Sequence, residues 1–300
     1  MASYQCDLCG GETSFYRQSE KMRQCLLCGV VSLSPDLIPT NLNSYYENNI
    51  FYTENAKDPV LVAGMIRSAR FYLSLLKKYI RPSGGQLLVD VGANFGILVE
   101  ESIRQGFQAI GLEKNKSLIL VGLERGLNIS DTNLSELVTS NQVAVITAMH
   151  VLEHLTQPRS LINDAFQKLA VGGILMLGIP NMDSYLAQKD GLSWRYVALE
   201  HLYYFSPKTL SQILIEEGFE ILAIKRDGTN LADLSLKKLL RYLIGGPLSR
   251  DRFQPKNTSG RQVAPTPKKN LFRLIIKNMI IFLIKILRRE DFIVIVARKK

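Results

Sequence analysis

The residue types best suited to chemistry are gathered in two parts of the chain. All four cysteines fall within the first 28 residues, as two Cys-x2-Cys pairs, and all three histidines lie between positions 150 and 201. Thiolates at such spacing bind metal ions, and an imidazole exchanges protons near neutral pH. The sequence therefore predicts a metal centre at the N-terminus and a separate chemical site in the middle of the chain.

The cysteine pairs have the spacing of a four-thiolate zinc centre. Fifteen residues separate the pairs, and the glycine after each pair permits the tight turn that points two sulfurs at one ion. Four thiolates close the tetrahedron of a structural site and leave no open position for a substrate. Disulfides are the alternative, but no apolar signal segment follows Met1, so a reducing cytoplasm is expected. The predicted ligands are Cys6, Cys9, Cys25 and Cys28.

The middle of the chain alternates between two kinds of apolar pattern. Short continuous apolar runs, typical of buried strands, are followed by segments with helical periodicity. This alternation predicts an α/β fold with a doubly wound, mainly parallel sheet and helices on both faces. We expect strands at 86–91, 107–112, 142–149, 173–179 and 219–226, and helices at 64–79, 95–105, 115–125, 158–170 and 206–217.

A glycine-rich turn follows the first of these strands. Asp90 lies near the end of the strand, and Gly92, Asn94 and Gly96 follow at alternate positions. Such a turn lets a ligand approach the backbone at a helix N-terminus, and ligands of these sheets bind beyond the carboxyl ends of the strands. Glu113 ends the next strand, 17 residues after Gly96, where a carboxylate can accept hydrogen bonds from ribose hydroxyls. Together the turn and the acid predict an adenosine-containing cofactor.

Two further runs resemble a known family. Residues 150–155 read HVLEHL and residues 200–207 read EHLYYFSP, within a series that spans roughly 86–226. This series resembles the class I S-adenosylmethionine (SAM) methyltransferases, and among them the branch found in bacterial sugar and surface-glycan pathways. An N-terminal four-cysteine zinc module before this domain is similar to that of the deoxysugar C-methyltransferases, which also carry an asparagine at the position of Asn94.

The resemblance implies a particular cofactor site and a seven-stranded, Rossmann-like sheet. Asp90 and the glycine turn that follows it (Gly92, Asn94 and Gly96) would bind SAM, with Glu113 on its ribose. Met149 and His150, at the tip of the strand expected at 142–149, would lie near the adenine or the transferred methyl group. The family's sheet ends with an antiparallel seventh strand, and residues 292–298 (FIVIVAR) fit it.

His201 is the candidate catalytic base. It stands beside Glu200, the second candidate catalytic residue, whose carboxylate could orient the imidazole or raise its pKa, just before a helix that we expect Ser206 to cap. Methyl transfer usually needs a base for the proton of the acceptor, and a matching Glu-His pair is implicated in proton abstraction in the deoxysugar C-methyltransferases. A hydrogen-bonded core histidine is the alternative for His201. His154 is expected to make a structural hydrogen bond, and His150 to form a wall of the cofactor pocket.

Charge divides the chain into unlike parts. The net charge is +10, but residues 235–300 carry +14 and residues 1–234 carry −4. Within the tail, 271–289 mixes Leu and Ile with Lys and Arg, which suits a helix on an anionic membrane surface; a cover for the sheet or a dimer contact is the alternative. The expected units are a zinc module at 1–34, a linker and lead-in helix at 35–80, a methyltransferase core at 81–227, a basic helical insertion at 228–291 and a last strand at 292–300.

Composition and motifs together favour an enzyme of the cytoplasm, with the inner face of the cell membrane as a peripheral site. A chain that is 46% hydrophobic and 21% charged is neither fibrous nor disordered, and it lacks an unbroken apolar run of membrane-spanning length. The expected function is SAM-dependent methylation of a nucleotide-linked, lipid-linked or surface sugar at oxygen or carbon. The alternatives are an RNA base methyltransferase, which would grip RNA through the zinc module and basic tail, and an adaptor built on an inactive scaffold. No DNA binding is expected.

Overall fold

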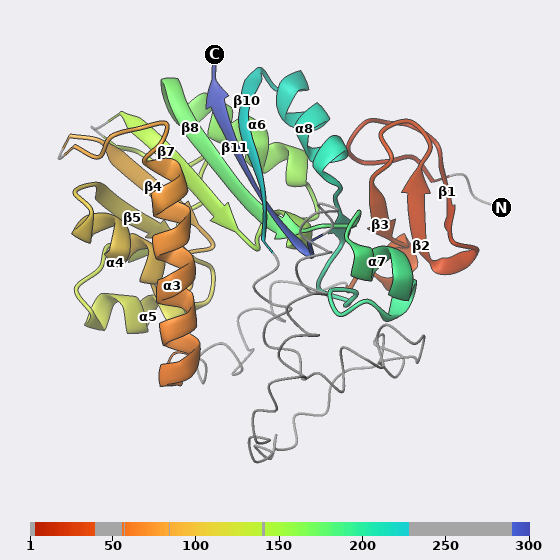
Figure 1. Ribbon diagram of the computed structural model, residues 1–300, viewed down its shortest axis with the longest axis horizontal. Coiled ribbons are helices and arrows are strands. Elements are labelled where there is room, and N and C mark those ends of the chain that lie inside the picture. Colours follow the sequence, from red (N-terminus) through yellow and green to blue (C-terminus); the bar gives the residue numbers. More distant parts are fainter. Residues whose placement is uncertain (1–3, 40–55, 57, 84, 140–141, 228–289) are drawn as a thin grey trace, which may run out of the picture.

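The computed structural model describes residues 4–39, 56, 58–83, 85–139, 142–227 and 290–300. Its main body is a seven-stranded sheet with helices on both faces, and a four-stranded sheet stands beside it (Figure 1). The expected insertion at 228–291, including the basic segment 271–289, lies outside the described residues except for its last two positions.

The main sheet has the strand order β10-β11-β8-β7-β4-β5-β6. Strand β11 is antiparallel to both of its neighbours, and the other neighbouring pairs are parallel. The predicted α/β class, the mainly parallel sheet and its antiparallel last strand are therefore confirmed. The strands are β4 (Leu87–Val91), β5 (Gln108–Leu112), β6 (Ile129–Ser130), β7 (Val143–Met149), β8 (Leu169–Pro180), β10 (Phe219–Asp227) and β11 (Phe292–Lys299).

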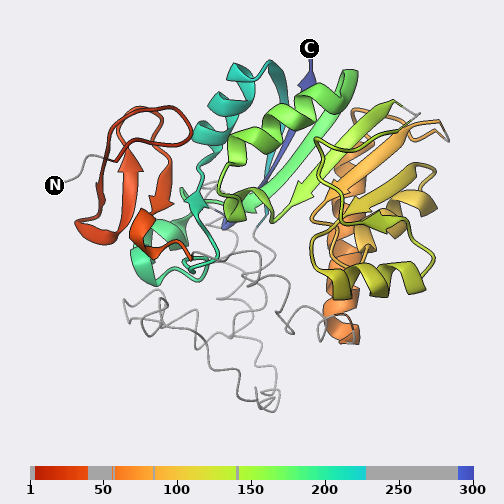
Figure 2. The same ribbon diagram turned by 180° about the vertical axis from the view of Figure 1, so that it is seen from behind.

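Helices cover the two faces of this sheet as separate groups. Helices α3, α4 and α5 pack on one face, whereas α6 and α8 pack on the other, as the two opposite views show (Figures 1 and 2). Each face has its own buried apolar cluster because the strands are apolar on both sides, as parallel strands between helices must be. The helices are α3 (Pro59–Leu76), α4 (Ile97–Arg104), α5 (Lys116–Glu124), α6 (Pro158–Lys168), α7 (Tyr185–Asp190) and α8 (Pro207–Glu216), with short 3-10 turns η1 (Pro35–Leu37), η2 (Leu152–His154) and η3 (Gly191–Ser193).

Side-chain caps fix where two of the helices begin. Ser206 Oγ accepts a hydrogen bond from Thr209 N at 3.1 Å, so α8 starts where the sequence predicts. Helix α3 starts earlier than the predicted residue 64, because Asp58 accepts hydrogen bonds from Val60 N and Leu61 N ahead of the apolar stretch. A cap thus extends the helix beyond the segment that periodicity alone identifies.

Helix α3 is long and apolar enough to cross a membrane by length and composition. It has 18 residues with a mean hydropathy of 1.2, and 28% of that stretch is buried within the protein. Ala69, Leu73 and Leu76, in its second half, are buried in the cluster that α3 shares with the sheet. Core helices pass the same test of length and composition, so this criterion is weak evidence for a membrane span.

The small sheet joins the N-terminus to a distant part of the chain. It has the order β1-β2-β3-β9, and β9 comes from the segment that follows His201. The β1–β2 hairpin closes with Arg17 and Gln18 at φ values of 51° and 60°, as a two-residue hairpin turn requires. The strands are β1 (Thr13–Tyr16), β2 (Ser19–Cys25), β3 (Val31–Leu33) and β9 (Tyr203–Tyr204), all paired antiparallel.

Candidate active site

The turn between β4 and α4 requires glycine at two positions. Gly92 and Gly96 have φ values of 69° and 86°, in the left-handed region that favours glycine. A Cβ atom on Gly92 would lie 2.4 Å from Val151 Cγ2, and one on Gly96 would lie 2.5 Å from Leu127 Cδ1. Asn94, between them, also has a positive φ of 53°. The two glycines therefore leave the backbone of the turn uncovered by side chains at these positions, close to the ends of the neighbouring strands.

Glu113 faces this turn from the end of β5. Its Oε2 accepts a hydrogen bond from Asn94 N at 2.8 Å, and its Oε1 accepts from Lys114 N and Asn115 N at 2.8 and 2.9 Å. The structure thus brings together the turn and the acid that the sequence singled out. A bare backbone turn opposite a fixed carboxylate fits the nucleoside part of SAM, with the turn beside the cofactor and Glu113 within reach of ribose hydroxyls.

Asp90 lies below the turn, inside the sheet. It is 4% exposed, and its Oδ1 accepts a hydrogen bond from Thr147 Oγ1 at 2.6 Å. Burial raises the pKa of Asp90 to about 7, and the charge of Glu113 adds to the rise, while the bond from Thr147 opposes it. Asp90 therefore braces β4 against β7, and Glu113 is the carboxylate that stands at the turn itself.

The tip of β7 carries Met149 and His150. His150 has a φ of 59°, in the left-handed region that few residues other than glycine adopt. Its ring stacks on Phe292, with the ring centroids 4.4 Å apart. Met149 lies against Gly178 of β8, where a Cβ would meet its sulfur at 2.5 Å. Backbone strain of this kind is typical of functional sites, and both residues stand at the sheet edge where the sequence placed them.

All three histidines of the chain surround one buried carboxylate. Glu153, in η2 directly after β7, has a side chain that is 1% exposed, and its Oε1 lies 3.3 Å from His150 Nδ1. The rings of His154 and His201 meet edge to face with centroids 4.6 Å apart. Burial alone would raise the pKa of Glu153, but the surrounding histidines hold that pKa below its ordinary value. The sequence reasoning missed Glu153, although the adjacent pair Glu153-His154 repeats the pattern of Glu200-His201.

Glu200 contacts the cluster through its backbone carbonyl, and the ring of His201 is packed beside two tyrosine rings. The backbone carbonyl of Glu200 accepts a hydrogen bond from His154 Nδ1 at 2.8 Å, so the structural hydrogen bond expected of His154 is present. His201 is enclosed by Tyr196 and Tyr204, whose ring centroids lie 6.2 and 6.4 Å from its own. Burial, together with the nearby His154, lowers the pKa of His201 to about 4. The His201 ring is therefore neutral at physiological pH.

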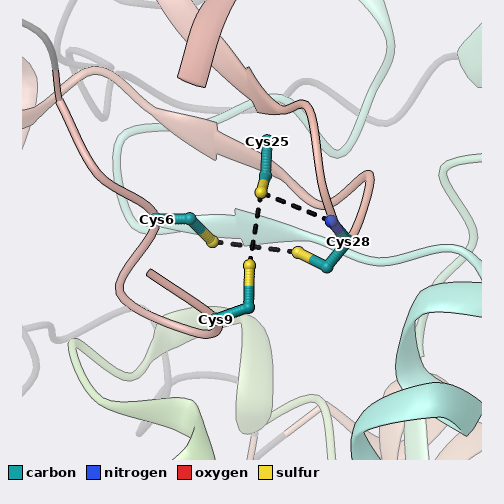
Figure 3. A group of neighbouring side chains, drawn as sticks. All are labelled: Cys6, Cys9, Cys25 and Cys28. Atoms are coloured by element: carbon teal, nitrogen blue, oxygen red, sulfur yellow. Dashed lines mark hydrogen bonds between the residues drawn. The ribbon is translucent and has the colours of Figure 1, made fainter. Parts of the chain in front are cut away.

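The four cysteine sulfurs point toward one another in the small sheet (Figure 3). Cys6 and Cys28 Sγ lie 3.8 Å apart and Cys9 and Cys25 Sγ lie 3.3 Å apart, well beyond a disulfide bond of about 2.05 Å. Zinc–sulfur bonds of about 2.3 Å in a tetrahedron separate the sulfurs by about 3.8 Å. The cysteines therefore fit a zinc ion closely, and the four thiols are free rather than paired in disulfides.

The cysteine-containing module is attached to the loop that carries His201. Strand β3 of the module pairs with β9, and Leu33 N donates a hydrogen bond to Leu202 O at 2.8 Å. Leu202 N in turn donates to Glu153 O at 2.7 Å. Tyr203 Oη donates to Asp7 Oδ2 at 2.9 Å, inside the first cysteine loop. The module therefore braces both segments of the histidine cluster, which the sequence did not indicate because these segments lie far apart in the chain.

Comparisons with known proteins agree with this architecture. The profile of a family described as "Methyltransferase domain" matches residues 66–224, just over half of the chain. The ubiquinone biosynthesis O-methyltransferase of Psychrobacter arcticus is 28% identical over 153 residues, which are 45% of this chain and 59% of that protein. The enzyme of the same name from Erwinia tasmaniensis is 30% identical over 108 residues, 33% of this chain and 44% of that protein. The chain thus spans less than two thirds of these relatives.

Two solved structures share the fold. A SAM-dependent methyltransferase from Archaeoglobus fulgidus has a TM-score of 0.51 at 19% identity, over 79% of this chain and 94% of that chain. Phosphoethanolamine N-methyltransferase 2 of Haemonchus contortus, in complex with phosphomonomethylethanolamine and S-adenosylhomocysteine, has a TM-score of 0.50 at 13% identity, over 76% of this chain and 52% of that chain. The family match, the seven-stranded sheet and the glycine turn facing Glu113 lead to one conclusion: the chain belongs to the methyltransferase-domain family.

Proposed function

We propose that this enzyme transfers the methyl group of SAM to a hydroxyl oxygen of a small acceptor, with a sugar as the first class to test. The convergence of two sites supports this proposal. Val151 links His150 to the Glu153 turn and also touches Gly92, so the histidine cluster adjoins the glycine turn. Direct transfer needs the two reactants held side by side in this way.

The two sites divide the work between them. SAM supplies an electrophilic methyl group on a positively charged sulfur. The glycine turn and Glu113 hold the nucleoside part of SAM at the ends of β4 and β5. The histidine cluster beyond β7 receives the acceptor: His201, next to Leu202 and its backbone hydrogen bond to Glu153, holds the hydroxyl group, and the cluster takes up the proton that this group loses as its oxygen takes the methyl group from sulfur.

Oxygen is favoured as the methylated atom because the matched curated relatives are O-methyltransferases. The sugar acceptor rests on the resemblance of the four-cysteine module, Asn94 and the Glu200-His201 pair to the deoxysugar enzymes. A phenolic ring hydroxyl is the second candidate, and it rests on the names of the same relatives, which act in ubiquinone biosynthesis. Carbon next to a keto group is the least favoured position.

The test is methyl transfer from isotope-labelled SAM to acceptor panels. Nucleotide sugars, lipid-linked sugars, phenols and total RNA are offered separately, and the labelled product is located by mass spectrometry. We expect label on a sugar oxygen, and a loss of rate of about 10²–10⁴-fold in His201→Ala with SAM affinity retained. Label on RNA alone, or on a sugar carbon, would contradict the proposal. A rate within about threefold of wild type in His201→Ala would remove His201 from the acceptor site.

A further inference from the structure

We propose that Glu153, His154 and His201 bind one divalent transition-metal ion, separate from the ion of the cysteine centre. One carboxylate oxygen and two imidazole nitrogens from these residues lie within 4.8 Å of one another. A role for this ion in methyl transfer rests on the proposed function, whereas its binding does not.

The first argument is the spacing of the donor atoms. Ligands about 2.1 Å from one tetrahedral ion stand about 3.4 Å apart. The three donor atoms are within 4.8 Å of one another, so small rotations of the side chains bring them to a shared ion. The two segments that carry the donor atoms are joined by a backbone hydrogen bond, 2.7 Å long, from Leu202 N to Glu153 O. The backbone around the donor atoms is therefore already fixed.

The second argument is the protonation of His154. A backbone carbonyl only accepts hydrogen bonds, so the Nδ1 atom of His154, 2.8 Å from Glu200 O, carries the proton. In the neutral ring the Nε2 atom of His154 is then unprotonated, which is the state of an imidazole nitrogen that binds metals. A backbone carbonyl that fixes the tautomer in this way is the usual outer partner of a metal-binding histidine.

Buried polar atoms at the centre of the cluster lack hydrogen bonds among the described residues. Oε1 of Glu153, whose side chain is 1% exposed, has His150 Nδ1 at 3.3 Å, and no other group in the described part of the chain donates a hydrogen bond to either of its oxygens. The buried Nδ1 atom of His201 has no hydrogen-bond partner among the same residues. Leaving a buried carboxylate and an imidazole nitrogen unsatisfied is costly. A cation between them satisfies both groups at once.

The donor set indicates the class of ion. Two imidazoles with one carboxylate suit zinc, manganese, iron or cobalt, whereas magnesium and calcium prefer oxygen ligands throughout. Three protein ligands leave at least one coordination position open, in contrast to the closed four-thiolate centre. His150, whose side chain is 43% exposed, lies beside Glu153 and marks the side from which solvent reaches the cluster. An acceptor hydroxyl could occupy the open position, where an ion lowers its pKa.

The experiment is a manganese titration of the full-length protein that carries a single equivalent of zinc, which the four thiolates of the cysteine centre take up in preference to the histidine cluster. Manganese binds thiolates poorly, so the loss of the free Mn²⁺ signal in electron paramagnetic resonance counts ions bound elsewhere. We expect about one Mn²⁺ per chain in wild type, and binding at least tenfold weaker in Glu153→Gln and in His154→Ala. Glu101→Gln is the matched control, because Glu101, on α4, is another buried glutamate and pairs with Arg70 of α3; its manganese binding should equal that of wild type.

The outcomes separate this proposal from the proposed function. SAM binding checks the fold of each variant, and His201→Ala replaces any variant that does not fold. Wild type that binds no Mn²⁺, or Glu153→Gln that binds it as wild type does, overturns the metal site. Binding of Mn²⁺ at this site without any hydroxyl methylation would leave the metal site standing and would count against the proposed function alone.

Discussion

The sharpest stability prediction concerns Asp90, because its carboxyl group is buried in the sheet with one hydrogen-bond donor, Thr147. Burial raises its pKa from 3.8 to about 7. Between these values the unfolded chain has lost the proton while the folded protein keeps it, so the folded state binds more protons and its stability falls as pH rises. Above pH 7 the Asp90 carboxyl group is ionised in both the folded and the unfolded chain, and the loss of stability is complete. A rise of about three pKa units corresponds to about 4 kcal/mol.

Asp90→Asn removes this titration. Asparagine is close in shape and its side-chain oxygen can still accept from Thr147, but it has no proton to lose. The difference in unfolding free energy, variant minus wild type, should therefore grow by about 4 kcal/mol between pH 4 and pH 7.5, or about 1.4 kcal/mol per pH unit. Urea unfolding at a series of pH values measures it, with the fluorescence of Trp194, the sole and fully buried tryptophan, as the signal.

A second variant tests the cause of the shift. Thr147 Oγ1 donates to Asp90 and favours its ionised form. Thr147→Val should raise the pKa of Asp90 further, so that the loss of stability continues beyond pH 7. Equal pH slopes in wild type and Asp90→Asn would refute the reasoning, because they would show that Asp90 titrates alike in the folded and unfolded chains.

Three further predictions follow from the metal centre, the cofactor site and the basic tail. Cys25→Ser should lose about one zinc per chain by elemental analysis and change the Trp194 fluorescence, since Trp194 belongs to the same buried cluster as Met22 of the small sheet; unchanged zinc content would contradict the centre. By calorimetry, Gly92→Arg should abolish SAM binding through its clash in the turn, and Glu113→Ala should weaken it by about 1–3 kcal/mol; wild-type affinity in both would contradict the cofactor site. Protein lacking 245–290 should bind SAM but no longer sediment with anionic liposomes at low salt; a full-length chain that ignores such liposomes would end the membrane interpretation.

The sequence by itself determined the main sheet. Its strands and helices are encoded by local patterns, namely apolar runs and a 3.6-residue period, so nearly every predicted segment between 86 and 226 corresponds to an observed element. The glycine turn was equally readable, because a positive φ at Gly92 and Gly96 demands glycine whatever surrounds it. The cysteine cluster was readable for a related reason: a pair of thiolates two residues apart encodes most of its own geometry.

The tertiary structure alone decided what the histidines face. Glu153 and His201 are 48 positions apart in the sequence. No local pattern predicts that Leu202 N donates a hydrogen bond to Glu153 O and so brings the two residues together. The same holds for β9, a two-residue strand that exists only because β3 supplies its hydrogen-bond partners. Strand pairing and buried polar contacts depend on which surfaces meet after the chain has folded. The burial that lowers the pKa of His201 and places Glu153 among the three histidines therefore becomes visible only in three dimensions.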